Sequence, residues 1–320
     1  WFWDKLDVNR HLYNIPYKVK LTGGIDPSRL HKAIRMMMVK HEILRTKIIE
    51  NDGRPMQKVD VEGGDVPFEV VNASMNPHDV EEFIEDKAKR AFDLSKGTLF
   101  EVVLYKVSPE DHTLFLNFHH SIFDDWSFTI FLEDLLSFYY SPERGLDSSQ
   151  LLQYQDYSEW HKKHLLIHRE NLVDYWSRIL EGNVEKVKFA DYHEEANESF
   201  EGESFHFHIP GKSVEKVNRL AKETGTTKFM VLMSLFQLML YKYTHKQDII
   251  VGAPVAGRPG GHFDQTLGFF VNTLPWRTQF DETSTFISLL RHVQKQSVDH
   301  LKHVHLPFED IVKEVRSGVE

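Results

Sequence analysis

The chain has 320 residues, of which 41% are hydrophobic and 27% charged, a globular composition in a chain long enough to form two lobes. Its formal net charge of -10 argues against a general affinity for nucleic acid or anionic membranes, and the absence of cysteine removes disulfides and thiolate chemistry. No apolar run reaches the roughly 20 residues that a membrane span requires, so we expect a soluble protein. The absence of cysteine fits a reducing cytoplasm, so we expect the protein to be cytoplasmic.

The first half of the chain alternates between predicted strands and helices. Residues 13–24 have the alternation of a strand, and residues 25–46 follow as an amphipathic helix with Asp26 as its N-cap and Pro27 at its first position. The order continues with a helix over 81–92, strands over 97–107 and 112–120, a helix over 126–140, and one or two helices over 154–180.

The second half has elements of the same kinds. A short helix over 213–225 stops at Gly225, and an apolar, buried helix is predicted over 227–246. The other predicted elements are strands over 203–209, 248–258 and 266–278, and a helix over 286–303. We therefore predict an α/β (α+β) fold of two lobes, formed by residues 1–180 and 181–320.

The stretch FHHSIFDDWSF, residues 118–128, is the strongest candidate for chemistry. On a strand, His120 shares a face with Phe118, whereas His119 points to the opposite face. Two imidazoles that point apart cannot both bind one metal ion, so we predict no metal site here.

Two interpretations of His120 remain. A histidine at a strand end is often a packed or solvated side chain without further function. At a junction of strand, tight loop and helix, however, an imidazole is held rigidly, and its unperturbed pKa near neutrality suits proton transfer. In that second interpretation Asp124 caps the following helix or pairs with an arginine.

Several stretches resemble, in order, the motifs of the condensation domains of nonribosomal peptide synthetases, which share the chloramphenicol-acetyltransferase-like fold. This resemblance spans nearly the whole chain. The stretches are WFWDKLD with YNIPYKVKLTG, KHEILRT (40–46), FHHSIFDDWS (118–127), YQDYSEW (154–160), LGFFVNTLPWRT (267–278) and HVHLPFEDIV (303–312).

The resemblance implies two lobes in a V with the active site between them, where an amide bond forms between two thioester substrates. An upstream donor and a downstream acceptor carrier protein would present these substrates on phosphopantetheine arms. The domain itself would bind no cofactor and no metal, and an adenylation domain would be its neighbour. Two tethered reactants gain a high effective concentration once they are aligned.

The resemblance also assigns roles to individual residues. His120 is the catalytic residue, either as the base for the attacking amine or as a group that positions or stabilises the tetrahedral intermediate. Asp124 holds the loop and pairs with Arg45, a contact that is directional when buried. Taken alone, Arg45 and Asn272 would be read as structural polar residues. Further residues are implied as active-site support (His119, Asp125, Trp126, Ser127) or as lining the channel (Asn272, Gly268).

The chain departs from the family pattern in two respects. Asp125 occupies the place of the motif glycine, so its backbone must tolerate a tight conformation or the loop is altered. A second carboxylate near His120 would also favour imidazolium and weaken a general base. In addition, the chain begins inside the first motif and ends soon after PFEDIV, so we expect the second lobe to lack its C-terminal elements.

Three alternatives to a condensation domain stay open. One is a carrier-protein-binding platform of the same fold with impaired catalysis, which Asp125 favours. Another is an epimerisation domain, whose family resemblance also includes the double histidine, although GFFVNTLPWR fits the condensation type better. The third is an acyltransferase that uses coenzyme A and needs no carrier protein.

Overall fold

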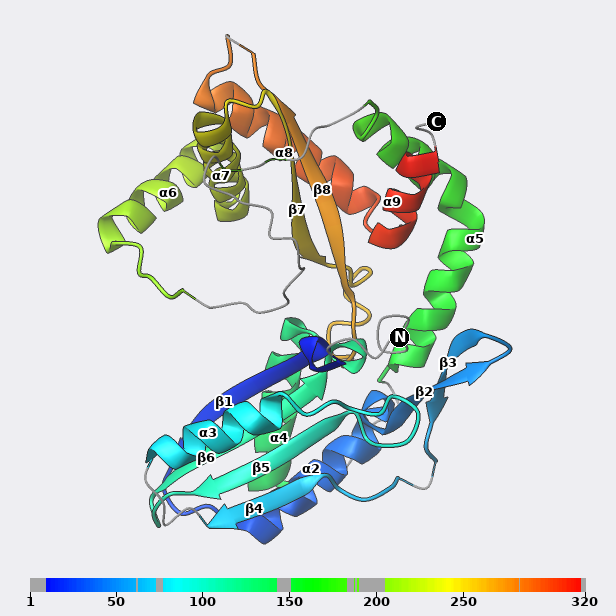
Figure 1. The fold of residues 1–320 in the computed structure, drawn as a ribbon, viewed down its shortest axis with the longest axis vertical. Coiled ribbons are helices and arrows are strands. Elements are labelled where there is room, and N and C mark those ends of the chain that lie inside the picture. The colour runs from blue at the N-terminus through cyan, green and yellow to red at the C-terminus, as the bar shows by residue number, and fades with distance from the viewer. Residues whose placement is uncertain are drawn as a thin grey trace. The chain divides into compact units, whose positions relative to one another are not determined.

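The computed structural model describes residues 10–61, 63–72, 77–142, 151–182, 187, 189, 205–281 and 283–317. The chain forms two compact units: Trp1–Trp160 with Arg258–Phe270, and His161–Gly257 with Val271–Glu320 (Figure 1). The long helix α5 (Tyr154–Ile179) thus contributes mainly to the second unit. The lobe boundary at residue 180 stays a prediction. Within the described ranges, no helix is long and apolar enough to cross a membrane.

The first unit is built on a four-stranded sheet in the order β1-β6-β5-β4. The pairs β1–β6 and β5–β6 are antiparallel, and β4–β5 is parallel. A separate antiparallel hairpin follows the first helix. The strands are β1 (Asn14–Thr22), β2 (Thr46–Asn51), β3 (Arg54–Val59), β4 (Phe68–Asn72), β5 (Phe100–Lys106) and β6 (Asp111–His119).

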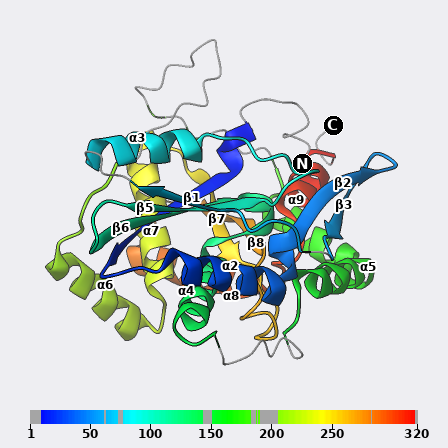
Figure 2. The ribbon, with the colours of Figure 1, turned by 90° about the horizontal axis from the view of Figure 1, so that it is seen from below.

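Helices cover both faces of this sheet. Figure 2 shows α3 (Pro77–Ala88) on one face and α2 (Pro27–Lys40) and α4 (Asp125–Tyr140) on the other. Side chains of β6 alternate between the two faces of the sheet. On one face Leu114, Leu116 and Phe118 pack with α2 and α4. On the other face Phe115 packs with α3. Residue 120, the first after this strand, begins the short helical turn η3 (His120–Ile122).

Helix α2 begins as predicted and ends earlier. The carboxylate of Asp26 accepts hydrogen bonds from two backbone amides of the first turn, and Pro27 occupies the first helical position. The helix stops at Lys40 because His41 adopts an extended backbone and buries its ring, with its Nε2 2.7 Å from Asp134. A short 3-10 helix, η2 (Glu42–Arg45), fills the rest of the predicted helical range.

The second unit packs helices around the antiparallel pair β7 (Asp248–Ala256) and β8 (Val271–Gln279). Trp176 of α5 and Trp276 of β8 are among its largest fully buried side chains. Gly225, with φ of 63°, ends α6 as predicted. The remaining helices of this unit are α6 (Gly211–Thr224), α7 (Lys228–Thr244), α8 (Phe286–Lys302) and α9 (Phe308–Ser317).

Three strand predictions need correction. Residues 205–209 form no strand, and Phe205 and Phe207 are 87% and 70% exposed, because no described strand pairs with them; residues 203 and 204 lie outside the described ranges. The strands predicted over 248–258 and 266–278 are β7 and β8, but the segment between them, Arg258–Phe270, leaves the pair and belongs to the first unit.

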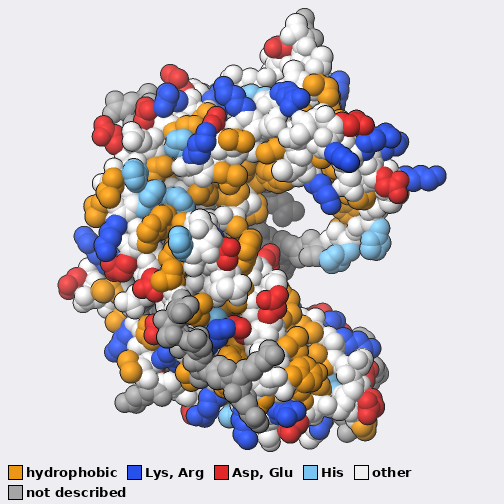
Figure 3. Space-filling model, turned by 180° about the vertical axis from the view of Figure 1, so that it is seen from behind, with side chains coloured by type: hydrophobic (Ala, Val, Ile, Leu, Met, Phe, Trp, Pro, Cys, Tyr) orange, Lys and Arg blue, Asp and Glu red, His pale blue; other side chains and the backbone are white. Residues whose placement is uncertain are grey.

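Histidine side chains gather over α5 in the second unit, where Figure 3 shows them as a pale blue group. The ring centroids of His164 and His168 lie 4.5 Å apart, and those of His164 and His305 lie 5.0 Å apart. Burial, together with the neighbouring charges that His161 and His164 would carry, lowers the pKa of His305 from 6.5 to about 4. The pKa of the fully buried His300 is also lowered to about 4, and burial is the largest cause.

These depressed pKa values predict a loss of stability in mild acid. The unfolded chain takes up protons as the pH falls below 6.5, whereas folded His300 and His305 do so only near 4, so protons favour the unfolded state in that window. We expect His300 to cost about 2 kcal/mol of unfolding free energy between about pH 7 and pH 4.5. Urea unfolding of wild type and His300→Gln at both pH values measures this loss of unfolding free energy. An equal pH dependence in the two proteins would contradict the prediction. The control is His208→Gln, which changes an exposed histidine.

Candidate active site

The double-histidine motif lies where β6 passes through the turn η3 into helix α4. Asp124 is the N-cap of α4, and its Oδ1 accepts hydrogen bonds from the Ser127 backbone amide at 2.8 Å and the Ser127 hydroxyl at 2.7 Å. Both side chains are buried. The strand end, the turn and the first helical turn are therefore held as one rigid junction.

The imidazole of His120 has a defined tautomer. Its Nδ1 lies 2.8 Å from the carbonyl oxygen of Phe123. A carbonyl can only accept a hydrogen bond, so Nδ1 must carry the proton, and Nε2 of the neutral ring then holds a lone pair. The ring of Phe269 lies against the imidazole at 4.8 Å with an interplanar angle of 75°. His120 thus offers a hydrogen-bond acceptor or base at Nε2.

His119 is held differently. Its ring is 3% exposed, and Nδ1 accepts a hydrogen bond from the Ser121 backbone amide at 3.2 Å while lying 2.8 Å from the Ser121 hydroxyl. The aromatic rings of Tyr13 and Phe92 lie 6.1 Å and 6.3 Å from it. The two histidines therefore have separate partners. Within the described ranges, no group of three or more histidine or acidic side chains could hold a metal ion.

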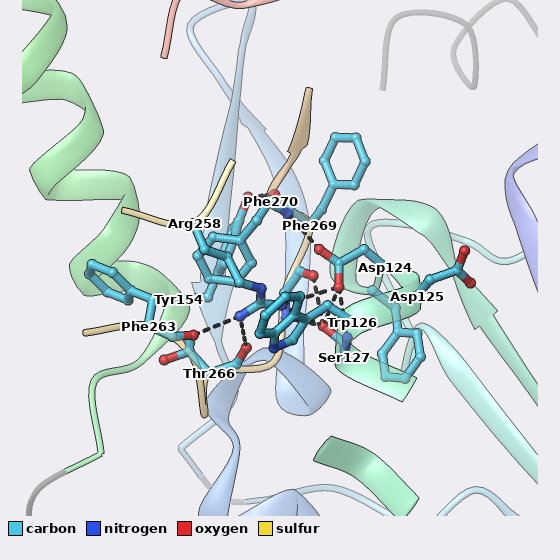
Figure 4. Close-up of polar contacts among 12 residues, drawn as sticks. Asp124, Asp125, Trp126, Ser127, Tyr154, Arg258, Phe263, Thr266, Phe269 and Phe270 are labelled. Atoms are coloured by element: carbon cyan, nitrogen blue, oxygen red, sulfur yellow. Dashed lines mark hydrogen bonds and ion pairs between the residues drawn. The ribbon is translucent and has the colours of Figure 1, made fainter. Parts of the chain in front are cut away.

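The ion-pair partner of Asp124 is Arg258, and the prediction of Arg45 is wrong. Nη2 of Arg258 lies 3.2 Å from Oδ1 of Asp124, and their side chains are 3% and 2% exposed (Figure 4). Nη1 donates to the carbonyls of Phe263 and Thr266, both at 2.7 Å. The guanidinium also lies over the ring of Phe270, 3.9 Å from its centroid.

Arg45 instead ties down the turn that follows α2. Its Nε donates to the carbonyl of Met38 at 2.6 Å, and its Nη1 donates to the carbonyl of Asp60 at 2.5 Å. Both acceptors are backbone oxygens, one in the last turns of α2 and the other directly after β3. Arg45 is therefore a structural residue of the first unit that does not contact the motif aspartate.

The C-terminal end of the segment Arg258–Phe270 is also hydrogen-bonded to the double-histidine motif. The Ser127 hydroxyl lies 3.1 Å from the Gly268 amide and 3.0 Å from the Gly268 carbonyl oxygen. Oδ2 of Asp124 accepts from the Phe270 amide at 3.1 Å. Trp126 joins this group, because its indole Nε1 donates to the Asp264 carbonyl at 3.1 Å. Of the predicted support residues, Asp124, Trp126 and Ser127 thus meet around one segment.

Gly268 and Asn272, the two residues predicted to line a channel, are both in close contact with neighbouring residues. A Cβ atom added to Gly268 would lie 2.1 Å from the ring of Tyr154, so this position has no room for a side chain. The Asn272 amide donates to the carbonyls of Val304 and Leu306, both at 2.7 Å, and its oxygen accepts from the Phe308 amide at 3.1 Å. Their place along a channel stays a prediction.

Asp125 adopts ordinary helical backbone. It is the first residue of α4, and among the described residues the non-glycine positions with positive φ are Asp52 and His245. Its Oδ1 accepts a hydrogen bond from the hydroxyl of Tyr17 at 2.8 Å, and burial together with this carboxylate raises the pKa of Tyr17. The expected strain at the position of the family's glycine is therefore absent.

Sequence reasoning missed Arg258, Phe269 and the hydroxyl of Tyr154, which donates to the Phe269 carbonyl at 2.6 Å. Arg258 ends the apolar run DIIVGAPVAGR, which has the pattern of a buried strand throughout. The only local signal was the arginine itself, followed by Pro-Gly-Gly, which indicates that the strand ends there.

Comparison with known sequences gives a family. The profile of the condensation domain matches residues 1–318. The chain is 33% identical over 308 residues to bacitracin synthase 3 of Bacillus licheniformis, covering 95% of this chain and 5% of that protein. It is 32% identical over 309 residues to tyrocidine synthase 3 of Brevibacillus parabrevis, covering 95% of this chain and 5% of that protein. The chain thus spans a small fraction of these relatives.

Solved structures share the fold. The first condensation domain of the calcium-dependent antibiotic synthetase, in complex with a substrate analogue, superposes with a TM-score of 0.84 at 19% identity, covering 98% of this chain and 76% of that chain. The X-domain from teicoplanin biosynthesis superposes with a TM-score of 0.82 at 20% identity, covering 95% and 69%. The predicted chloramphenicol-acetyltransferase-like fold is confirmed. With the profile match over almost its whole length, the chain belongs to the condensation domain family of nonribosomal peptide synthetases.

Proposed function

We propose that this domain forms an amide bond between a donor acyl or peptidyl thioester and an acceptor aminoacyl thioester. Both substrates would be carried on phosphopantetheine arms, the donor by an upstream and the acceptor by a downstream carrier protein. The observation that carries this proposal is the tautomer of His120, whose Nδ1–H is occupied by the Phe123 carbonyl so that Nε2 presents its lone pair.

The reaction can be written for this imidazole. The amine nitrogen of the acceptor attacks the thioester carbonyl carbon of the donor, the C–N bond forms and the C–S bond breaks. Nε2 of His120 accepts the proton that the amine loses, and that proton is returned to the departing thiolate. While Nε2 carries that proton, it can donate a hydrogen bond to the oxyanion of the tetrahedral intermediate. Because both substrates are tethered, alignment supplies much of the rate.

The rest of the motif positions His120. Asp124 and Ser127 fix the loop that contains the Phe123 carbonyl, and Arg258 neutralises the buried carboxylate of Asp124. Asp125 lies one residue further on, with one carboxylate oxygen occupied by the Tyr17 hydroxyl. These groups support the proposal without touching the reacting atoms.

We expect His120→Ala to lower the rate of amide formation by on the order of 100-fold, the range that a positioned acid or base contributes. The assay loads donor and acceptor on carrier proteins and follows the amide product on the acceptor carrier. His208→Ala is the matched control, since His208 is exposed in a segment without regular structure. Amide formation at the wild-type rate in His120→Ala would remove the imidazole from the mechanism.

A second candidate function is a binding platform without catalysis. Two observations favour it: Asp125 replaces the family's glycine, and the fold also matches the teicoplanin X-domain, which has been solved in complex with OxyB. The same assay separates the candidates, because a platform binds loaded carriers while the wild-type domain forms no amide. Omitting the donor carrier and supplying acyl-coenzyme A tests the acyltransferase alternative, and inversion of the donor without amide formation would identify an epimerisation domain.

The proposed setting is a cytoplasmic, multidomain synthetase with an adenylation domain as a neighbour. Its support is the small share of each relative that the chain covers, 5% of bacitracin synthase 3 and 9% of surfactin synthase subunit 2 of Bacillus subtilis. A four-domain nonribosomal peptide synthetase of known structure, bound to AMP and glycine, matches with 23% of its chain covered. Reading the coding sequence on either side of this chain tests the proposal directly.

A further inference from the structure

Phe269 is a residue of the first unit, and both it and its two neighbours in the chain have hydrogen-bonded backbone groups. Its own carbonyl accepts the hydroxyl of Tyr154 at 2.6 Å. The preceding Gly268 donates its amide to the hydroxyl of Ser127, and the following Phe270 donates its amide to Asp124. Hydrogen bonds on three consecutive residues leave the Phe269 side chain little freedom in its direction.

The rings of Phe269 and Phe270 serve different purposes. Phe270 is 2% exposed and lies against the guanidinium of Arg258. Phe269 is 37% exposed, and in Figure 4 its ring points away from that guanidinium. The ring of Phe269 is exposed because its backbone is fixed and the ring of Phe270 already fills the space beside the Asp124–Arg258 ion pair.

The outward ring of Phe269 contacts the imidazole of His120 edge to face, with centroids 4.8 Å apart. The imidazole is then restricted by two contacts, the Phe123 carbonyl at Nδ1 and the Phe269 ring. A 180° flip of the ring would place a ring carbon beside the Phe123 carbonyl, break the hydrogen bond and leave the tautomer unfixed. The contact with Phe269 opposes that flip, so it helps to keep the lone pair at Nε2.

We infer that Phe269 is a positioning residue for His120: its ring packs on the imidazole and helps to keep Nδ1 on the Phe123 carbonyl. The effect on turnover rests on the proposed function, because it requires that Nε2 of His120 takes part in amide formation.

Nitrogen-15 NMR of histidine-labelled protein tests the positioning role without any turnover. In wild type we expect the His120 signals of a single Nδ1–H tautomer, and in Phe269→Ala a mixture of tautomers. Phe269→Tyr keeps the ring and should restore the wild-type spectrum, and Phe269→Leu is a second variant if the alanine variant does not fold. Phe83→Ala removes a 45% exposed phenylalanine from α3 and is the control. A wild-type spectrum in both Phe269→Ala and Phe269→Leu would overturn the inference.

The carrier-loaded assay tests the effect on turnover. In Phe269→Ala we expect about a tenfold fall in kcat, with the KM for the acceptor carrier changing less than about twofold. An unchanged kcat would overturn this part. A wild-type protein that forms no amide overturns the proposed function, whereas the NMR result on His120 is decided independently of turnover.

Discussion

Asp124→Ala is expected to lower the free energy of unfolding by about 3–5 kcal/mol, because it leaves the buried charge of Arg258 without a countercharge. The two side chains are 2% and 3% exposed, so water cannot replace the lost carboxylate. The variant also loses the N-cap of α4 and the acceptor of the Phe270 amide. Because these contacts fasten the segment that presents Phe269 to His120, turnover should fall as well.

Urea unfolding at neutral pH measures this loss, and the chain contains a matched control. Asp26 is also an N-cap aspartate, capping α2 through two backbone amides, but it is exposed and takes part in no ion pair that the structure describes. Asp26→Ala should cost only the cap, about 1 kcal/mol. If both alanine variants lose the same free energy, the pair with Arg258 adds nothing.

A double-mutant cycle assigns the partner of Asp124. Arg258→Met should cost about as much as Asp124→Ala, and the double variant should cost much less than the sum, because no charge remains buried. Arg45→Met should be additive with Asp124→Ala, since Arg45 binds the carbonyls of Met38 and Asp60. Strong coupling of Asp124 to Arg45 with none to Arg258 would reverse the assignment made from the structure.

Gly268→Ala is expected to destabilise the first unit by about 2–3 kcal/mol through overpacking. The added Cβ would lie 2.1 Å, 2.7 Å and 2.9 Å from three ring atoms of Tyr154, distances at which something must move. The ring cannot move freely, because its hydroxyl is bound to the Phe269 carbonyl. The backbone of Gly268 cannot retreat either, since both its amide and its carbonyl contact the Ser127 hydroxyl.

Thermal unfolding of Gly268→Ala beside Gly97→Ala measures this effect, since no described atom lies within 4 Å of a Cβ added at Gly97. Gly97→Ala should be close to neutral. Combining Gly268→Ala with Tyr154→Ala should recover part of the loss, because the second change removes the ring that the first one meets. A double variant that is as unstable as the sum of its parts would show that Tyr154 is not the obstacle.

Much of the secondary structure follows from local patterns. The alternation of residues 112–118 is that of a strand with two packed faces, and the structure places Leu114 and Leu116 on one core and Phe115 on the other. Asp26 with Pro27, and Gly225 at the end of α6, were identified correctly because caps act through residues that are neighbours in sequence. The motif resemblance led to the family in the same way, from short stretches and their order.

The errors come from contacts between distant residues. His41 ends α2 because its ring is buried against Asp134, 93 residues further along the chain, and the amphipathic pattern of residues 25–46 contains no sign of this. Residues 205–209 alternate like a strand, yet a strand needs a partner for its backbone groups, and none is described beside them. Propensity indicates what a segment can form, and tertiary contacts decide whether it does.

The sequence by itself determined the class of fold, the family and the candidate His120, because each depends on residue types at short spacing. Only the tertiary structure decided which nitrogen of His120 bears the lone pair, that Arg258 rather than Arg45 pairs with Asp124, and that Phe269 lies on the imidazole. The Asp124–Arg258 pair joins residues 134 positions apart. Such a contact arises where burial forces a charge to find a partner in space, and no periodicity in the chain encodes which one it finds.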